Sequence, residues 1–332
     1  MVRPVAEAAL VSGGDVYDAR VIAGLRELGW AVEDAQVPGS WPRPALPARR
    51  RLDALLADGD GPVLLDGLVA GGVPDVVVPH AARRPLAVLV HLPLGEEAPD
   101  LDAGEKAVLH HAACVIATSP WTARRLGMPD VVVAVPGVDL APPAAGTDGV
   151  HRLLCLGAVT PTKGQDLLVE ALAALREHPW TLDLVGPIGR APGFVADLRD
   201  RIDRHGLTDR VRLHGPRADL EDIWHATDLL VAFSRVETYG MVVSEAFARG
   251  IPVIASAAGG LPDTVANGGV LTPPEDVPAL VATLHRWFAE PTLRDGLRIS
   301  ASRQRCSLTA WTQTSRRVDR ALAELPAFPP PA

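Results

Sequence analysis

The chain of 332 residues has very little lysine, tyrosine and cysteine. Lysine and arginine together number 32, but only two of these residues are lysines, Lys106 and Lys163. The three cysteines, Cys114, Cys155 and Cys306, lie far apart and match neither a metal-binding spacing nor a disulfide framework. We therefore expect free thiols and a reducing, cytoplasmic environment.

Long apolar runs are also missing. No segment approaches the length of about 20 residues that a membrane-spanning helix needs, and the start, MVRPVAEAALVSGG, lacks the features of a signal peptide. The formal net charge of −8 argues against a nucleic-acid partner. Arginine clusters at residues 49–51, 83–84 and 124–125 would permit peripheral contact with an anionic membrane, but solvated faces are the preferred interpretation. The oligomeric state is left open.

Apolar strands that alternate with helices fill most of the chain. Segments such as GPVLLDGL and PLAVLVHLPL in the first half, and RLLCLGAV and LLVAFS in the second, are nearly continuous runs of Val, Leu and Ile. This pattern is typical of a parallel sheet covered on both faces. A short strand at residues 6–11 and a glycine turn open the series. We predict an α/β protein of two Rossmann-like, doubly wound domains.

A segment rich in Pro, Gly and Ala, residues 140–150, separates the two series. We predict an N-terminal domain at 1–145, a C-terminal domain at 150–305, a helix at 306–325 that would cross back to the first domain, and a disordered tail at 326–332. Ligands of such sheets bind outside the carboxyl ends of the strands. The two domains would therefore face each other across a central cleft.

The segment SRVETYGMVVSEAFARGIPVIASAAGG places Glu237 and Glu245 eight positions apart, around the start of a predicted helix. A helix N-terminus suits a phosphate group, and Gly240 would let a ligand approach the backbone. Glu237 could accept hydrogen bonds from a sugar, and Glu245, roughly 8 Å further along the helix, from a ribose. The alternative is a solvated loop residue and an exposed helix residue. The apolar neighbours of Glu245 favour a buried helix and a nucleotide-sugar site.

Residues 234–265 resemble the signature of glycosyltransferase family 4, the retaining enzymes of GT-B fold with a Glu-x7-Glu motif. The resemblance runs through both glutamates, Tyr239, Gly240 and Pro262, and it extends over most of the chain. LGAVTPTKGQDLLVEAL resembles the phosphate loop of the family, VPGVD resembles the end of its first domain, and GGDVYDARVIAGLRELGW resembles its N-terminal glycine loop and helix.

The resemblance implies metal-independent transfer of a sugar from a nucleotide diphosphate sugar, with a UDP-sugar as the first choice, to a small-molecule or glycan acceptor with retention of configuration. No cofactor is implied. Lys163 falls on the diphosphate-binding lysine and His91 on a histidine that reaches the donor sugar, so the implied catalytic residues are Glu237, Lys163 and His91. The donor-binding residues would be Glu245, Thr238, Tyr239, Gly240, Met241, Arg235, Gly13 and Gly14.

Three side chains keep a structural alternative beside the functional one. His91 could be a satisfied histidine at a strand end, and Lys163 an exposed loop residue. Asp66 also follows a strand, where it could bind an acceptor hydroxyl or cap a helix. Asp18 is expected to lie on a helix surface. The triplets Asp58-Gly-Asp60 and Asp100-Leu-Asp102 are interpreted as loop carboxylates, and no metal site is predicted.

Two departures from the family pattern keep rival functions open. Ala158 follows Gly157 where an arginine is usual, so the diphosphate would be met by Lys163 alone, by Arg235 or by backbone amides. Thr238 stands where a glycine is usual. The alternatives are a catalytically silent nucleotide-sugar-binding module and a GT-B sugar-nucleotide epimerase. A phosphorylase is disfavoured, because Lys106 is the only other lysine and lies in a predicted helix outside the cleft.

Overall fold

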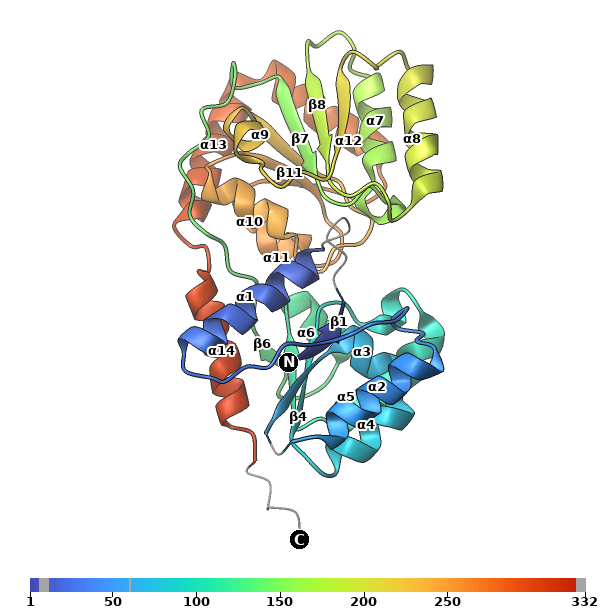
Figure 1. Cartoon of the computed structure of the whole chain (residues 1–332). Helices are drawn as coiled ribbons and strands as arrows, with labels where there is room; N and C mark the ends of the chain where they lie inside the picture. The colour runs from blue at the N-terminus through green and yellow to red at the C-terminus, as the bar shows by residue number, and fades with distance from the viewer. Residues whose placement is uncertain (6–11, 60, 327–332) are drawn as a thin grey trace. The chain divides into compact units, whose positions relative to one another are not determined.

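The structure of the chain is a computed structural model that describes residues 1–5, 12–59 and 61–326. These residues form two compact α/β units (Figure 1). The first is built mainly from Gly13–Gly137 and is completed by the segment that begins at Thr309, and the second is built mainly from Val138–Leu308. Each unit contains a parallel sheet of six strands. The predicted α/β class with two doubly wound domains is confirmed.

The first unit places short helices around its sheet. Its strands are β1 (Val2–Pro4), β2 (Ala35–Val37), β3 (Val63–Asp66), β4 (Leu86–Val90), β5 (Cys114–Ala117) and β6 (Val132–Val133). Its helices are α1 (Gly13–Glu27), α2 (Leu46–Ala57), α3 (Gly67–Gly72), α4 (Pro74–Ala81), α5 (Asp102–His111), α6 (Pro120–Leu126) and α14 (Trp311–Ala323), with 3-10 turns η2 (Leu94–Glu96) and η3 (Pro99–Leu101). The strand order is β2-β1-β3-β4-β5-β6, all parallel, so the order reverses between β1 and β3. The central strands β3 and β4 are buried at every position, as expected for a sheet covered on both faces.

The second unit has a larger apolar core. Its strands are β7 (Arg152–Leu156), β8 (Thr181–Val185), β9 (Val211–Gly215), β10 (Leu229–Ala232), β11 (Val253–Ser256) and β12 (Val270–Thr272). Its helices are α7 (Gln165–Ala173), α8 (Pro192–Arg204), α9 (Glu221–His225), α10 (Met241–Ala248), α11 (Leu261–Val265), α12 (Val277–Ala289) and α13 (Pro291–Arg305), with the 3-10 turn η4 (Pro161–Lys163). The strand order is β12-β11-β10-β7-β8-β9, which reverses between β10 and β7. This is the order of a dinucleotide-binding fold, whose ligands bind at the reversal.

The last helix, α14, belongs to the first unit although it follows the second in sequence. It packs against α1, and Figure 1 shows the two helices side by side. The Trp30 indole N–H donates to the carboxylate of Asp319 at 2.8 Å, and Val318 joins Tyr17 and Val21 in one apolar cluster. The packing of this apolar face explains why the chain returns to its first unit.

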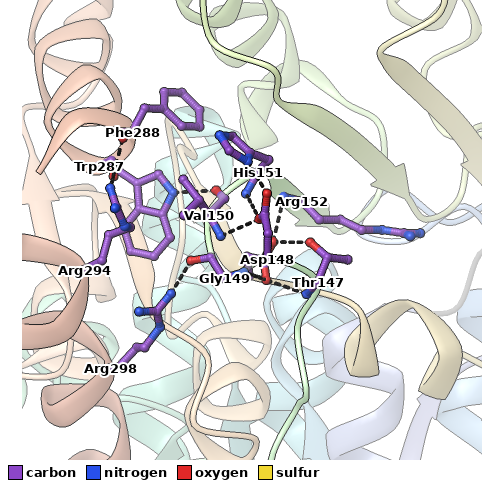
Figure 2. Close-up of polar contacts among 11 residues, drawn as sticks. Thr147, Asp148, Gly149, Val150, His151, Arg152, Trp287, Phe288, Arg294 and Arg298 are labelled. Carbon is purple, nitrogen blue, oxygen red and sulfur yellow. Dashed lines mark hydrogen bonds and ion pairs between the residues drawn. The ribbon is translucent and has the colours of Figure 1, made fainter. Parts of the chain in front are cut away.

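The predicted linker at residues 140–150 is part of the second unit, and the division falls earlier, at Gly137. The buried carboxylate of Asp228 accepts hydrogen bonds from the backbone N–H groups of Thr147 and Gly149 at 2.7 and 3.1 Å. Figure 2 shows the Trp287 indole N–H donating to the carbonyl of Val150 at 2.8 Å. These hydrogen bonds hold the segment against the second unit. The Pro- and Gly-rich composition therefore belongs to an ordered loop of that unit, not to a free linker.

Several predicted boundaries differ from the structure. The strand predicted at residues 6–11 and most of the tail predicted to be disordered, residues 327–332, lie outside the described residues. Gly13 and Gly14 begin α1 instead of forming a turn before it. In the valine-rich segment DVVVAVPGVD, residues 130–139, only β6 is a strand, because the Tyr17 hydroxyl donates to the carbonyl of Ala134 at 2.8 Å and the Thr314 hydroxyl to that of Val135 at 2.8 Å. None of the helices in the described ranges is both long enough and apolar enough to cross a membrane.

Candidate functional site

The loops that follow β7 and β10 meet where the strand order of the second sheet reverses. The backbone N–H groups of Arg235 and Val236 donate to the carbonyl of Thr162 at 2.7 and 3.3 Å, which ties the two loops together. Lys163, at the end of η4, forms an ion pair through Nζ with Oε2 of Glu237. The lysine side chain is 30% exposed and the glutamate side chain 13%. Two residues predicted to be catalytic, 74 positions apart in sequence, are therefore in direct contact.

The N-terminus of α10 opens directly beside this ion pair. Gly240 precedes the helix with φ of 86°, in the left-handed region that favours glycine. A Cβ atom there would lie 2.7 Å from Cδ2 of Leu261. No side chain of the described residues caps this end of α10, so the N–H groups from Met241 onward keep the partial positive charge of a helix start. An anion such as a phosphate would find donors here.

The turn after β11 fixes the position of Glu237 from the other side. The backbone N–H of Gly260 donates to the carbonyl of Glu237 at 2.8 Å. Gly259 has φ of 56°, and a Cβ atom on it would lie 2.0 Å from that same carbonyl oxygen. Close approach of two backbones therefore requires glycine at this position. The carboxylate also accepts the N–H of Thr238 through Oε1 at 3.2 Å.

Tyr239 faces the interior rather than solvent. Its carbonyl accepts a hydrogen bond from the Thr264 hydroxyl at 2.5 Å, and its hydroxyl accepts one from Ser244 at 3.3 Å. Burial raises the pKa of the Tyr239 phenol, so the group is neutral. Its hydrogen bonds with Ser244 and Thr264 stabilise the start of α10.

Glu245 lies further along α10 and is half-buried. Burial raises the pKa of its carboxyl, the charge of Arg249 lowers it, and Asp139 raises it further. The Arg249 guanidinium bonds the backbone carbonyl of Glu245 and pairs with the carboxylate of Glu221 at 2.5 Å. Within the described part of the chain, the Glu245 carboxylate accepts no hydrogen bond. A half-buried carboxylate without donors is suited to binding hydroxyl groups of a ligand.

Arg235, predicted to bind the donor, is engaged within the protein. Its guanidinium bonds both carboxylate oxygens of Asp166 at 2.9 and 2.8 Å and one oxygen of Glu275 at 2.9 Å. It also donates to the carbonyl of Pro161 at 2.6 Å. The hydrogen bond to Asp166 raises the pKa of Arg235. Arg235 thus holds the phosphate loop in place, because bidentate pairing occupies its planar head group. Its contact with the donor stays a prediction.

The first unit gathers a second group of polar side chains at the carboxyl ends of β3 and β4. His91, one residue after β4, places Nε2 at 3.0 Å from Oδ1 of Asp18 and 3.7 Å from Oδ2 of Asp66. The ring also meets Tyr17 edge to face, with centroids 5.3 Å apart. Asp66 caps α3 through Oδ1, which accepts from the N–H of Leu68 at 2.7 Å. Capping, the structural alternative weighed for Asp66, therefore uses Oδ1, whereas Oδ2 lies on the side of His91. Contact of Asp66 with an acceptor hydroxyl stays a prediction.

The electrostatics of this cluster keep the imidazole protonated. Burial lowers the pKa of His91, but the charge and hydrogen bond of Asp18 and the charge of Asp66 outweigh it and raise the pKa to about 9. Burial raises the pKa of Asp66 to about 6 against the opposing charge of His91. One side-chain atom each of Asp18, Asp66 and His91 lies within 4.8 Å of the other two, so these atoms could also serve as ligands of a metal ion. His91 Nε2 is already bonded to Asp18, so the arrangement is complete as an ion pair.

Asp18 is the residue that the sequence prediction placed wrongly. It is 3% exposed, not a surface residue of α1. It shares the buried face of this helix with Val21, Ile22 and Leu25, and the three- and four-residue spacing of that face was a signal that could have identified it. Gly13 and Gly14 start the same helix, and their contact with a ligand stays a prediction.

Comparisons with known proteins agree with this geometry. Residues 150–290 match the family model described as glycosyl transferases group 1. A D-inositol 3-phosphate glycosyltransferase of Nocardiopsis dassonvillei is 34% identical over 285 residues, which are 75% of this chain and 65% of that protein. A lipopolysaccharide core biosynthesis mannosyltransferase, LpsB of Rhizobium meliloti, is 33% identical over 53% of this chain and 55% of its own length. The matched part of the chain thus spans less than two thirds of these curated relatives.

Solved structures show the same fold at lower identity. A sucrose-phosphate synthase of Thermosynechococcus elongatus superposes with a TM-score of 0.81 at 22% identity, over 98% of both chains. The Anabaena protein HepE, in a complex with UDP and glucose, superposes with a TM-score of 0.78 at 22% identity, again over 98% of both chains. With the two Rossmann-like units and the segment from Glu237 to Glu245, these matches show that the chain has the GT-B fold and that residues 150–290 resemble the group 1 glycosyl transferases.

Proposed function

We propose that the chain is a retaining glycosyltransferase of family 4, which transfers a sugar from a nucleotide diphosphate sugar to a hydroxyl group of a small-molecule or glycan acceptor. The observation that carries this proposal is the contact between Lys163 and Glu237 at the open N-terminus of α10. A cation, a carboxylate and free helix N–H groups are the groups needed for a diphosphate and a sugar. Glu245, further along the helix, supplies a carboxylate for the ribose.

The reaction requires stabilisation of the leaving diphosphate. Lys163 and the N–H groups at the start of α10 would meet its negative charge, and no metal ion is assigned a role. Glu237 would exchange part of its contact with Lys163 for hydroxyls of the donor sugar. The acceptor hydroxyl would attack on the face from which the phosphate leaves, and a phosphate oxygen would take its proton. No protein base is assigned.

Two residues of the first unit are further candidates for contact with a ligand. His91 is a charged hydrogen-bond donor, because Asp18 keeps it protonated and occupies Nε2. Its Nδ1–H is the group that would donate to the donor sugar. Asp66 is the candidate for contact with an acceptor hydroxyl, through the oxygen that does not cap α3.

We propose uracil as the base of the donor nucleotide. HepE of Anabaena, which shares the fold, has been solved with UDP and with UDP-glucose. The names of the curated relatives mention inositol 3-phosphate and the lipopolysaccharide core, two acceptor classes with sugar-like hydroxyls. We therefore propose a UDP-sugar as donor and keep the acceptor at the level of a polyhydroxylated molecule.

Calorimetric titration of the full chain with UDP, GDP and ADP tests the proposal directly. We expect UDP to bind, and Lys163→Met and Glu245→Gln each to weaken it by about tenfold or more, which corresponds to about 1.4 kcal/mol. Lys106→Met and Glu290→Gln are matched controls, because these residues form exposed ion pairs within α5 and beside α12. The proposal is wrong if no nucleotide binds, or if the control variants lose as much affinity as the site variants.

A catalytically silent donor-binding module remains the second candidate, because Ala158 follows Gly157 where the family pattern has an arginine. The replacement removes one positive charge from the phosphate loop, and Arg235 cannot replace it while paired with Asp166. Incubation with UDP-glucose and a panel of polyols distinguishes the two. Release of UDP that depends on both Lys163 and an acceptor supports the enzyme, and tight donor binding without turnover supports the module.

A further inference from the structure

Two imidazole rings meet on the second unit, away from the proposed donor site. His178 precedes β8, at the amino edge of the sheet, whereas Lys163 and Glu237 follow strands at the carboxyl edge. Nε2 of His178 lies 3.3 Å from Nδ1 of His285 on α12. Oε1 of Glu177 lies 3.5 Å from the same Nε2. The three donor atoms all lie within 4.8 Å of one another.

The protein holds the two rings in place. The ring of His178 stacks on Phe288, with centroids 4.9 Å apart and an angle of 27° between the planes. Its carbonyl accepts a hydrogen bond from Arg210 at 2.7 Å. On the other side, α12 is anchored by the fully buried Leu284 and Trp287, on either side of His285 in the sequence. Both nitrogens are therefore presented by packed elements, with the His178 side chain half-buried and the side chains of Glu177 and His285 exposed.

The spacing of the two ring nitrogens fits a shared tetrahedral ion. They lie 3.3 Å apart, a distance at which one ring can also donate to the other when no ion is bound. Two imidazoles bound to zinc at about 2.0–2.1 Å in tetrahedral geometry have their nitrogens about 3.3–3.4 Å apart. Two imidazoles and a carboxylate form a donor set that zinc and neighbouring transition metals prefer.

We propose that Glu177, His178 and His285 form a binding site for one divalent transition-metal ion, with zinc as the first choice. The three side chains supply three ligands and leave a fourth position to water. Because the ion would join α12 to the turn before β8, its role is structural: it stabilises the second unit and takes no part in sugar transfer. The inference does not depend on the proposed function.

The test uses the full chain without a polyhistidine tag, freed of metal by a chelator. Zinc is titrated in competition with a chromophoric chelator, and cobalt absorption reports the coordination geometry. We expect one tightly bound equivalent in the wild type and at least about 30-fold weaker binding in His285→Gln, since one ligand in three is lost. Zinc should raise the Tm of the wild type by several degrees and leave that of His285→Gln unchanged.

Two further variants serve as controls. His110→Gln changes an exposed histidine whose ring Nδ1 bonds the carbonyl of Lys106 in its own helix at 2.7 Å, and His91→Gln removes the histidine of the other candidate cluster. Both should keep the zinc affinity of the wild type. The inference is overturned if zinc binds no tighter than about 100 µM, if His285→Gln binds it unchanged, or if His91→Gln is the variant that loses it. A pure hydrogen-bonded histidine pair would give the first of these results.

Discussion

Nε2 of His91 lies 3.0 Å from Oδ1 of Asp18, and this contact joins the end of β4 to the buried face of α1. Both partners are largely withdrawn from water, with side-chain exposures of 24% and 4%. The aspartate therefore decides the protonation state of the histidine, because a charge in a poorly solvated environment is weakly screened.

Asp18→Asn should lower the pKa of His91 from about 9 towards its ordinary value of 6.5, because it removes the main charge that opposes burial of the imidazolium. The shift is expected to exceed about one unit. The ring protons of His91, assigned by comparison with His91→Gln, are followed by NMR across a pH titration. Asp53→Asn is the matched control, since it removes the partner of His80 in the same unit. An unchanged pKa of His91 in Asp18→Asn would contradict our account of the pair.

The stability of the first unit should fall as the pH rises from about 6.5 to about 9. The folded state holds the His91 proton up to about pH 9, whereas the unfolded chain releases it near 6.5. Folded protein therefore binds more protons in this window, and the free energy of unfolding decreases with pH. We expect a loss of roughly 1–3 kcal/mol, measured by denaturant unfolding at a series of pH values. His91→Gln should remove this slope, and an equal slope in that variant would rule out His91 as its source.

Arg235→Ala should lower the free energy of unfolding of the second unit. The guanidinium is 25% exposed and bonds Asp166 in a bidentate manner, so its loss leaves a half-buried carboxylate unpaired. We expect a loss of roughly 1–3 kcal/mol of unfolding free energy. A double-mutant cycle with Asp166→Ala measures the coupling, and the variant Arg286→Ala, which breaks an exposed pair with Glu290, should cost far less. A coupling energy near zero would mean that Arg235 and Asp166 are not a structural pair in solution.

Gly259→Ala should displace Glu237 and weaken nucleotide binding together with stability. Its φ of 56° and the carbonyl of Glu237 at 2.0 Å from an added Cβ leave no room for a methyl group. A loss of roughly 1–3 kcal/mol is expected. Gly193→Ala is the matched control, because a Cβ there meets no atom within 4 Å and the residue lies in the first turn of α8. Thermal unfolding and UDP titration check both variants, and equal behaviour of the two would contradict the prediction.

Most elements were predictable from the sequence because each carries its own local pattern. Strands β3 and β7 are apolar runs, and Ser119 before Pro120 marks the start of α6, where its hydroxyl accepts the N–H of Thr122 as a cap. The strand β6 is shorter than its run of valines suggests, because side chains from α1 and α14 bond the carbonyls that a longer strand would use. Such contacts come from distant parts of the chain and leave no local signal.

The sequence by itself determined the alternation of buried strands and helices, the glycine before α10, and the polar residues at strand ends, Lys163, Glu237 and His91. Each depends on residue type and short-range spacing, which act within a few turns of backbone. Only the tertiary structure decided which of these residues meet. The strand order brings Lys163 to Glu237, the packing of α1 buries Asp18 beside His91, and the return of α14 completes the first unit. These long-range contacts depend on how separate helices and strands bury their apolar faces against one another, and local residue spacing does not specify this packing.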